Sequence, residues 1–131
     1  VYPDHDGPLS EDLPVRPVDI YALSKVLTES MGQFFAATAE LQCISARLFN
    51  TFGPGESHPH LVPEIIESLK AGPTLRLGNI HTKRDYIYVD DVATALYALA
   101  MVKVEGHLAV NVGTGREHSA EEIVAIISVL M

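Results

Sequence analysis

The segment Tyr21-Ala22-Leu23-Ser24-Lys25 opens the longest helical pattern in the chain. Apolar residues recur after it at helical spacing, which predicts a helix from about Ile20 to Glu40. Because about four residues make one helical turn, Tyr21 and Lys25 are expected on the same face. An ammonium group held near a phenol stabilises the phenolate, and such a phenol can exchange protons with a hydroxyl or carbonyl group. The pair is therefore either a candidate active site or an ordinary exposed turn.

A short apolar segment follows this helix and predicts a buried strand over Cys43–Leu48. Helical patterns flank it, so a parallel sheet is expected. Two glycines and a proline in Phe49–Gly55 then predict a loop. Loops at the carboxyl ends of strands commonly hold ligands in α/β proteins.

The remainder of the chain alternates between helical and strand patterns, which predicts an α/β fold. Asp90 and Asp91 fit the first turn of a helix, and Ser119 with Glu122 forms a capping box. The expected elements are a helix at Leu61–Ala71, a hairpin of Leu75–Gly78 and Tyr86–Val89, a helix from Asp90 to Leu99, a strand at Leu108–Val112 and a helix from Ala120 to about Leu130.

Composition predicts one compact domain over residues 1–131, with 47% hydrophobic residues and 20% charged ones. The formal net charge of -8 argues against a nucleic-acid or anionic-membrane surface. The single cysteine, Cys43, fits core packing in a reducing compartment. No apolar run reaches membrane-spanning length and no leader is visible, so we expect a cytoplasmic protein without membrane contact. Val1 at the start of the chain leads us to expect a fragment.

Three polar side chains are candidates for ligand binding. The guanidinium of Arg84 can grip a phosphate, or it can pair with Asp85 or Asp90 at the surface. Asn50 and Asn111 each follow a predicted strand and precede a glycine-rich turn. Both would lie at one sheet edge, where they either hold a polar ligand or cap their own loops.

The histidine pair in His58-Pro59-His60 has metal-ligand character. No third or fourth ligand is signalled by spacing, so we interpret the pair as loop polarity and expect no metal site. Gly53-Pro54-Gly55 lacks the Gly-Lys-Ser/Thr ending of a phosphate-binding P-loop.

Five segments, taken together and in this order, resemble the carboxyl-terminal half of an extended short-chain dehydrogenase/reductase of the NAD-dependent sugar-nucleotide epimerase and dehydratase family. They are Tyr21-x-x-x-Lys25, Arg47 to Gly55, Leu61-Val62-Pro63, Arg84 to Val92 and Asn111 to Gly115. The resemblance covers nearly the whole chain.

The resemblance implies the carboxyl-terminal part of a Rossmann-type parallel sheet with a small substrate-binding α/β subdomain, and NAD as cofactor. The amino-terminal NAD-binding half would lie outside this chain. Tyr21 would be the acid/base, Lys25 would favour its phenolate and bind the nicotinamide ribose, and Phe49 would lie near the nicotinamide. The implied pocket for a nucleotide-diphosphate sugar contains Asn50, Leu61, Leu75, Leu77, Arg84 and Asn111, with Arg84 on the diphosphate.

In the chemistry that the family implies, Tyr21 takes a proton from the 4-hydroxyl of the sugar while hydride passes to NAD+. The resulting 4-keto sugar is then epimerised or dehydrated. Val1-Tyr2-Pro3 resembles a Val-Tyr-Gly segment, so the serine or threonine of the catalytic set would lie upstream. The family also implies a homodimer formed through the helix at 20–40.

Two alternatives remain open at this stage. One is a non-catalytic nucleotide-sugar-binding or regulatory domain with the same fold. The other is a reductase of the same superfamily that acts on small carbonyl compounds.

Overall fold

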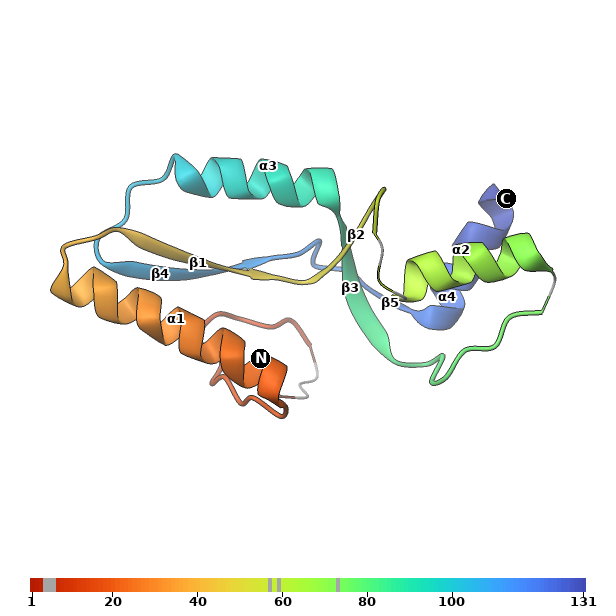
Figure 1. Cartoon of the computed structure of the whole chain (residues 1–131), viewed down its shortest axis with the longest axis horizontal. Helices are drawn as coiled ribbons and strands as arrows, with labels where there is room; N and C mark the ends of the chain where they lie inside the picture. The colour runs from red at the N-terminus through yellow and green to blue at the C-terminus, as the bar shows by residue number, and fades with distance from the viewer. Residues whose placement is uncertain (4–6, 57, 59, 73) are drawn as a thin grey trace. The chain divides into compact units, whose positions relative to one another are not determined.

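The computed structural model describes residues 1–3, 7–56, 58, 60–72 and 74–131, and it confirms the predicted α/β class with parallel strands (Figure 1). The chain divides into two compact units, one of Val1–Leu48 and Ala93–Val112 and one of Phe49–Val92 and Gly113–Met131. The elements in order are α1 (Ile20–Thr38), β1 (Cys43–Leu48), β2 (Asn50–Phe52), α2 (Leu61–Ala71), β3 (Lys83–Tyr88), α3 (Val89–Ala100), β4 (His107–Val112), β5 (Glu117–Ser119) and α4 (Ala120–Leu130).

The first unit is a parallel pair of strands between helices. β1 and β4 pair in register from Cys43 opposite His107 to Leu48 opposite Val112. α1 packs against one face of this pair, and the end of α3 covers the other (Figure 1). The buried residues of α1 are Ala22 and Ala36, whose small side chains allow the helix to approach the sheet closely.

The structure confirms the predicted long helix, α1. It begins after Asp19, whose Oδ1 accepts a hydrogen bond of 2.6 Å from the Ala22 amide and so caps the helix. It ends at Thr38 rather than at the predicted Glu40. Glu40 has a φ of 51°, which is left-handed backbone that a right-handed helix cannot contain.

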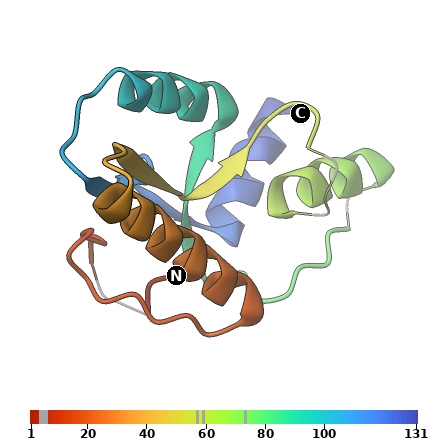
Figure 2. The same cartoon turned by 60° about the vertical axis from the view of Figure 1, so that its left-hand side comes forward.

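The second unit contains a three-stranded sheet and two helices (Figure 2). β2 runs parallel to β3, with Asn50 opposite Tyr86, and β5 runs antiparallel to β3 on its other side. α2 packs against α4, and Ile65 of α2 is fully buried. The predicted capping box of Ser119 and Glu122 is present at the start of α4.

Two sequence predictions are wrong in this unit. Leu75–Gly78 forms no strand, and the segment predicted as a loop, Phe49–Gly55, contains the strand β2. Both predictions fail because the strands that pair with β3 are set by the tertiary fold. β2 and β5 occupy the two edges of β3, so Leu75–Gly78 has no edge of β3 left to pair with. A strand as short as β2 also carries no readable alternation.

Within the described residues, no helix has both the length and the apolar character that a bilayer span requires.

Candidate functional site

Tyr21 and Lys25 lie together on the exposed side of α1, near its beginning. The Nζ atom of Lys25 is 4.9 Å from the centroid of the Tyr21 ring, so the two side chains share a face as expected. Tyr21 is 69% exposed, which leaves its ring accessible to a ligand. This arrangement can present a phenol beside a cation to a bound hydroxyl or carbonyl group.

An ion pair anchors α1 to the sheet. Arg47 of β1 donates to Glu29 through both prongs of its guanidinium, from Nε to Oε2 at 2.9 Å and from Nη2 to Oε1 at 2.6 Å. Both side chains are largely buried, with 12% and 16% exposure. The hydrogen bonds from Arg47 lower the pKa of the Glu29 carboxyl, and Glu29 in turn raises the pKa of Arg47. Both groups therefore stay charged.

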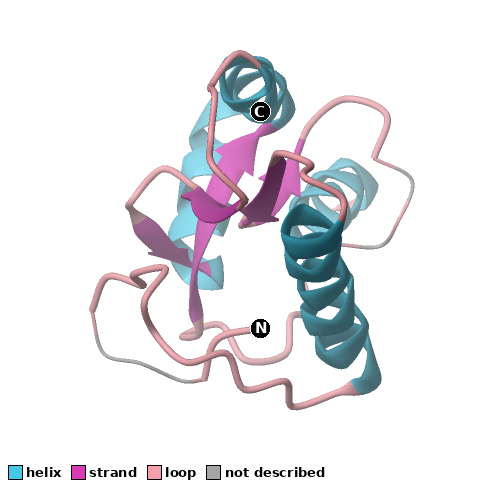
Figure 3. Cartoon of the chain, turned by 90° about the vertical axis from the view of Figure 1, so that its left-hand side faces the viewer, coloured by secondary structure: helices cyan, strands magenta, loops and turns pink. Residues whose placement is uncertain are grey.

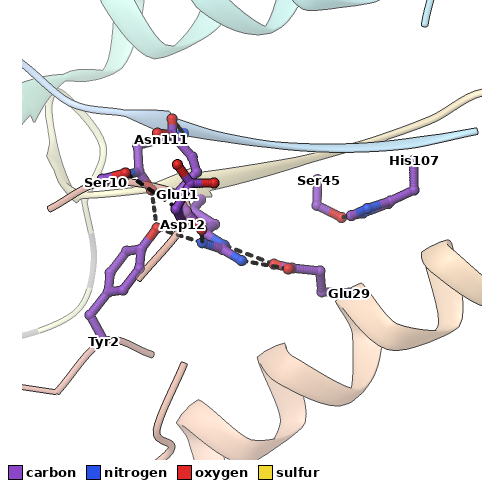
Figure 4. A network of polar contacts seen from close by, with 9 residues as sticks. Tyr2, Ser10, Glu11, Asp12, Glu29, Ser45, His107 and Asn111 are labelled. Carbon is purple, nitrogen blue, oxygen red and sulfur yellow. Dashed lines mark hydrogen bonds and ion pairs between the residues drawn. The ribbon is translucent and has the colours of Figure 1, made fainter. Parts of the chain in front are cut away.

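The hydroxyl of Tyr2 extends this ion pair to the start of the chain (Figure 4). It accepts a hydrogen bond of 2.5 Å from Nη1 of Arg47 and donates one of 2.7 Å to Oδ1 of Asn111. The Arg47 guanidinium carbon also lies 5.2 Å from the centroid of the Tyr2 ring. One phenol thus joins the amino-terminal segment to β1 and β4.

Asn111, which the resemblance assigns to the substrate, is bonded to the loop before α1. Its Nδ2 donates to the carbonyl oxygen of Leu9 at 2.9 Å, and its backbone amide donates to Oε1 of Glu11 at 2.7 Å. The second bond is the main reason why the pKa of Glu11 is lowered. With Oδ1 bonded to Tyr2, the side-chain amide of Asn111 holds protein groups through both its oxygen and its nitrogen.

In the second unit, Asp85 has a different partner from the one considered in the sequence. Its carboxylate accepts hydrogen bonds from the backbone amides of Thr114 and Gly115 at 3.0 and 2.8 Å, and from the Thr114 hydroxyl at 2.7 Å. The guanidinium of exposed Arg84 donates from Nη1 to the carbonyl oxygen of Lys83 at 2.8 Å. Asp85 therefore organises the turn after β4.

Arg84 and Asn50 lie on the same face of the sheet in this unit. Asn50 is paired with Tyr86 across β2 and β3, and Arg84 stands two positions before Tyr86, so the side-chain alternation of a strand places all three on one side. His118 is the cross-strand neighbour of Arg84 on β5. Burial raises the pKa of the Tyr86 phenol, against the opposing effect of Arg84. The face presents hydrogen-bond donors beside a permanent positive charge.

The apolar residues of the predicted pocket are half-buried members of the second unit: Phe49, Leu61, Leu75 and Leu77. Phe49 precedes β2 and lies against Gly113, where an added Cβ would come within 2.9 Å of its ring. Leu61 is the first residue of α2. The predicted site residues thus fall into two groups, with Tyr21, Lys25 and Asn111 in the first unit.

The histidine pair makes contacts of its own. Nδ1 of His60 lies 2.5 Å from a carboxylate oxygen of Glu56, and the rings of His58 and His60 are 5.8 Å apart. Pro59 between them lies outside the described residues. In the described part of the chain, no three histidine, cysteine or acidic side chains are grouped so that they could hold a metal ion.

Sequence reasoning missed Tyr2 and Glu29 as members of the site's surroundings. Glu29 had a readable signal, because it continues the spacing of Tyr21 and Lys25 by a further turn. Arg47 had one as well, since a charged residue in a buried strand requires a partner. Tyr2 had none, because nothing local indicates that it reaches Arg47.

Comparison with known proteins matches residues 1–113 to the model of the NAD dependent epimerase/dehydratase family. The chain is 32% identical to the dTDP-4-dehydro-6-deoxyglucose reductase of Escherichia coli, over 97% of this chain and 41% of the relative. It is 36% identical to the UDP-glucose 4-epimerase of Mycolicibacterium smegmatis, over 88% of this chain and 38% of that relative.

A solved structure described as MoeE5 in complex with UDP-glucuronic acid and NAD has a TM-score of 0.88 and 34% identity, and the match covers 100% of this chain and 45% of that one. The chain thus spans about two fifths of the length of the curated relatives. The family model covers most of the chain, including the Tyr21 and Lys25 pair and the Arg84 strand. The chain therefore belongs to the NAD dependent epimerase/dehydratase family.

Proposed function

We propose that the full-length protein carries out NAD-dependent chemistry at carbon 4 of a nucleotide-diphosphate sugar, by epimerisation or 4,6-dehydration through a 4-keto sugar. The observation that carries this proposal is the exposed Tyr21 with Lys25 beside it, on a helix anchored to the sheet, in a chain of this family. The relatives named above, which include a UDP-glucose 4-epimerase, support the same substrate class.

Tyr21 is the acid/base in this proposal and removes the proton from the sugar's 4-hydroxyl. Lys25 stands one turn away and stabilises the phenolate by its charge. The exposed, paired side chains suit contact with a nicotinamide ribose, and Phe49 would lie near the nicotinamide. When bound, NAD+ supplies the acceptor for the hydride from carbon 4. The main NAD cradle would lie in the part of the protein upstream of this chain.

The face that carries Asn50, Arg84 and Tyr86 is the proposed contact for the nucleotide diphosphate. A guanidinium can donate two parallel hydrogen bonds to phosphate oxygens and keeps its charge at every physiological pH. Arg84 is exposed, and its strand, β3, pairs with β2 on one side and β5 on the other. The strand that carries the guanidinium is therefore held by pairing on both sides. Leu61, Leu75 and Leu77 complete the proposed lining in this unit. Asn111 is a separate proposed substrate contact, in the first unit.

We assign the two units to the two parts that the resemblance implies. The parallel pair β1 and β4 with α1 would be the carboxyl-terminal part of a Rossmann-type sheet. The second unit, with α2 and α4 beside its short strands, would be the small substrate-binding subdomain.

The test is turnover by the full-length protein with NAD+ and a panel of UDP, dTDP, GDP and CDP sugars, with products identified by nuclear magnetic resonance. We expect a 4-epimer or a 4-keto-6-deoxy sugar from one member of the panel. Binding of a nucleotide sugar without any product would instead favour the non-catalytic domain.

A reductase of 4-keto nucleotide sugars is a second candidate, favoured by the 32% identity to the dTDP-4-dehydro-6-deoxyglucose reductase. It predicts that NADH or NADPH is consumed when a 4-keto nucleotide sugar is supplied and that simple nucleotide sugars are left unchanged. The same residue, Tyr21, would then donate its proton to the carbonyl oxygen.

A further inference from the structure

We infer that Tyr2, Arg47 and Glu29, together called the Tyr2 clamp, position the Tyr21 and Lys25 turn of α1 for catalysis. The inference rests on the proposed function and adds positioning residues that touch neither substrate nor cofactor. It is carried by a continuous path of hydrogen bonds from Glu29 on α1 to Arg47 on β1 and to Tyr2 before the loop (Figure 4).

The clamp fixes the helix in two directions. A two-pronged contact between a guanidinium and a carboxylate has one favoured geometry, so it restrains both the rotation of α1 about its axis and its sliding along β1. Glu29 lies about 12 Å along the helix axis from Tyr21, at a rise of about 1.5 Å per residue. A small rotation at Glu29 therefore moves the Tyr21 hydroxyl.

The clamp also contacts the segment that leads into α1. Figure 3 shows this segment as a loop, in pink. Arg47 donates from Nη1 to the carbonyl oxygen of Glu11 at 3.3 Å as well as to Tyr2. Asn111 holds Leu9 and Glu11 from β4, and the Arg16 amide donates to the carbonyl oxygen of Val1 at 2.9 Å. The loop before Tyr21 is thus bonded to Arg47, to Asn111 and to Val1, the residue next to Tyr2.

Replacing Tyr2 by phenylalanine removes only the hydroxyl oxygen and keeps the ring, so it is the smallest substitution that breaks the network. Removing that oxygen leaves Nη1 of Arg47 without its 2.5 Å acceptor and Oδ1 of Asn111 without its donor. Partly buried polar groups that lose partners seek new ones, so the guanidinium is expected to shift. The shift would pass to Glu29 and then to the catalytic turn.

The test uses Tyr2→Phe in the full-length protein, with Tyr97→Phe as the control because Tyr97 is 71% exposed on α3. We expect Tyr2→Phe to lower kcat by about ten- to hundredfold with an unchanged KM for the nucleotide sugar, since misplacement of a catalytic group costs rate rather than binding. Glu29→Gln should reproduce this fall in kcat.

Hydrogen exchange gives a readout that does not depend on turnover. We expect faster exchange of the amides of residues 22–28 and of the loop at 9–16 in Tyr2→Phe and unchanged exchange in Tyr97→Phe. Unchanged exchange in residues 22–28 would overturn the inference even if the protein has no activity. A lower melting temperature with unchanged kcat and KM would also overturn it, because the clamp would then be only a stabilising contact.

Discussion

Asp85 organises the backbone around the proposed phosphate contact. It accepts three hydrogen bonds from Thr114 and Gly115, and this ties the turn after β4 to β3. The Asp85 carboxylate is occupied by these bonds. The guanidinium of the neighbouring residue, Arg84, is exposed and donates to the Lys83 carbonyl oxygen instead. The hydrogen bonds that occupy the Asp85 carboxylate therefore leave the Arg84 guanidinium exposed and able to contact a ligand.

Gly113 is required by the close approach of this turn to β3. An added Cβ would lie 2.7 Å from Oδ2 of Asp85 and 2.9 Å from the ring of Phe49. We expect Gly113→Ala to destabilise the protein by about 1–3 kcal/mol, the usual cost of overpacking. Urea unfolding measures this, and Gly78→Ala is the control because nothing lies within 4 Å of its added Cβ. Equal stability of the two variants would contradict the packing described here.

Arg84 is expected to carry much of the affinity for the diphosphate. Loss of charge-assisted hydrogen bonds costs about 1.5–3 kcal/mol, so Arg84→Gln should weaken nucleotide-sugar binding by about ten- to hundredfold. Calorimetric titration measures the change, and Arg16→Gln is an exposed control outside the second unit. An unchanged dissociation constant for Arg84→Gln would remove Arg84 from the site.

At the scale of the element, α1 combines an exposed site with a buried anchor. Tyr21 and Lys25 face solvent, whereas Glu29 on the same helix is held by Arg47. A rigid helix is a good support for catalytic groups, because their positions then depend on packing rather than on a loop.

The Arg47 and Glu29 pair predicts a pH dependence of stability. The folded state depresses the pKa of Glu29, so the contribution of the pair is complete above the unfolded value of 4.5 and is lost as the pH falls through the folded value. Glu29→Gln should lower stability by about 1–3 kcal/mol at pH 7 and by progressively less below pH 4.5. Melting temperatures of the wild type and the variant across pH measure the difference. A constant difference at all pH values would show that charge is not the cause.

The elements differ in how far the sequence predicts them. α1, α2, α4, β1 and β4 are predicted because their apolar period or caps are local properties. β2 and the Leu75–Gly78 segment are predicted wrongly because the partners of β3 are chosen in the fold. The Tyr21 and Lys25 pair is readable from spacing alone, whereas the link from Tyr2 to Arg47 joins residues 45 positions apart and has no local signal.

At the scale of the whole molecule, the exposed apolar side of α1 is the surface that the proposed homodimer would use. The side chains of Ile20, Leu27, Met31 and Phe34 are 81%, 55%, 59% and 62% exposed. Exposed apolar patches on a helix commonly mark protein interfaces. Two such helices packed together would bury these residues.

We therefore expect Leu27→Glu to convert a dimeric full-length protein into a monomer, because a charge would be buried at the centre of the interface. Sedimentation velocity measures the oligomeric state. Val129→Glu is the control, since Val129 is 86% exposed and belongs to α4 rather than to α1. A dimer that survives Leu27→Glu, or a monomeric wild type, would contradict dimerisation through α1.

The most direct test of the central claim is the turnover of a nucleotide sugar by full-length Tyr21→Phe compared with the wild type and Tyr97→Phe. Loss of a general acid/base should lower kcat by about 100- to 10,000-fold and leave the dissociation constant of the nucleotide sugar within about twofold. Tyr97→Phe should turn over like the wild type. Full activity of Tyr21→Phe would contradict the assignment of Tyr21 as the group that moves the proton.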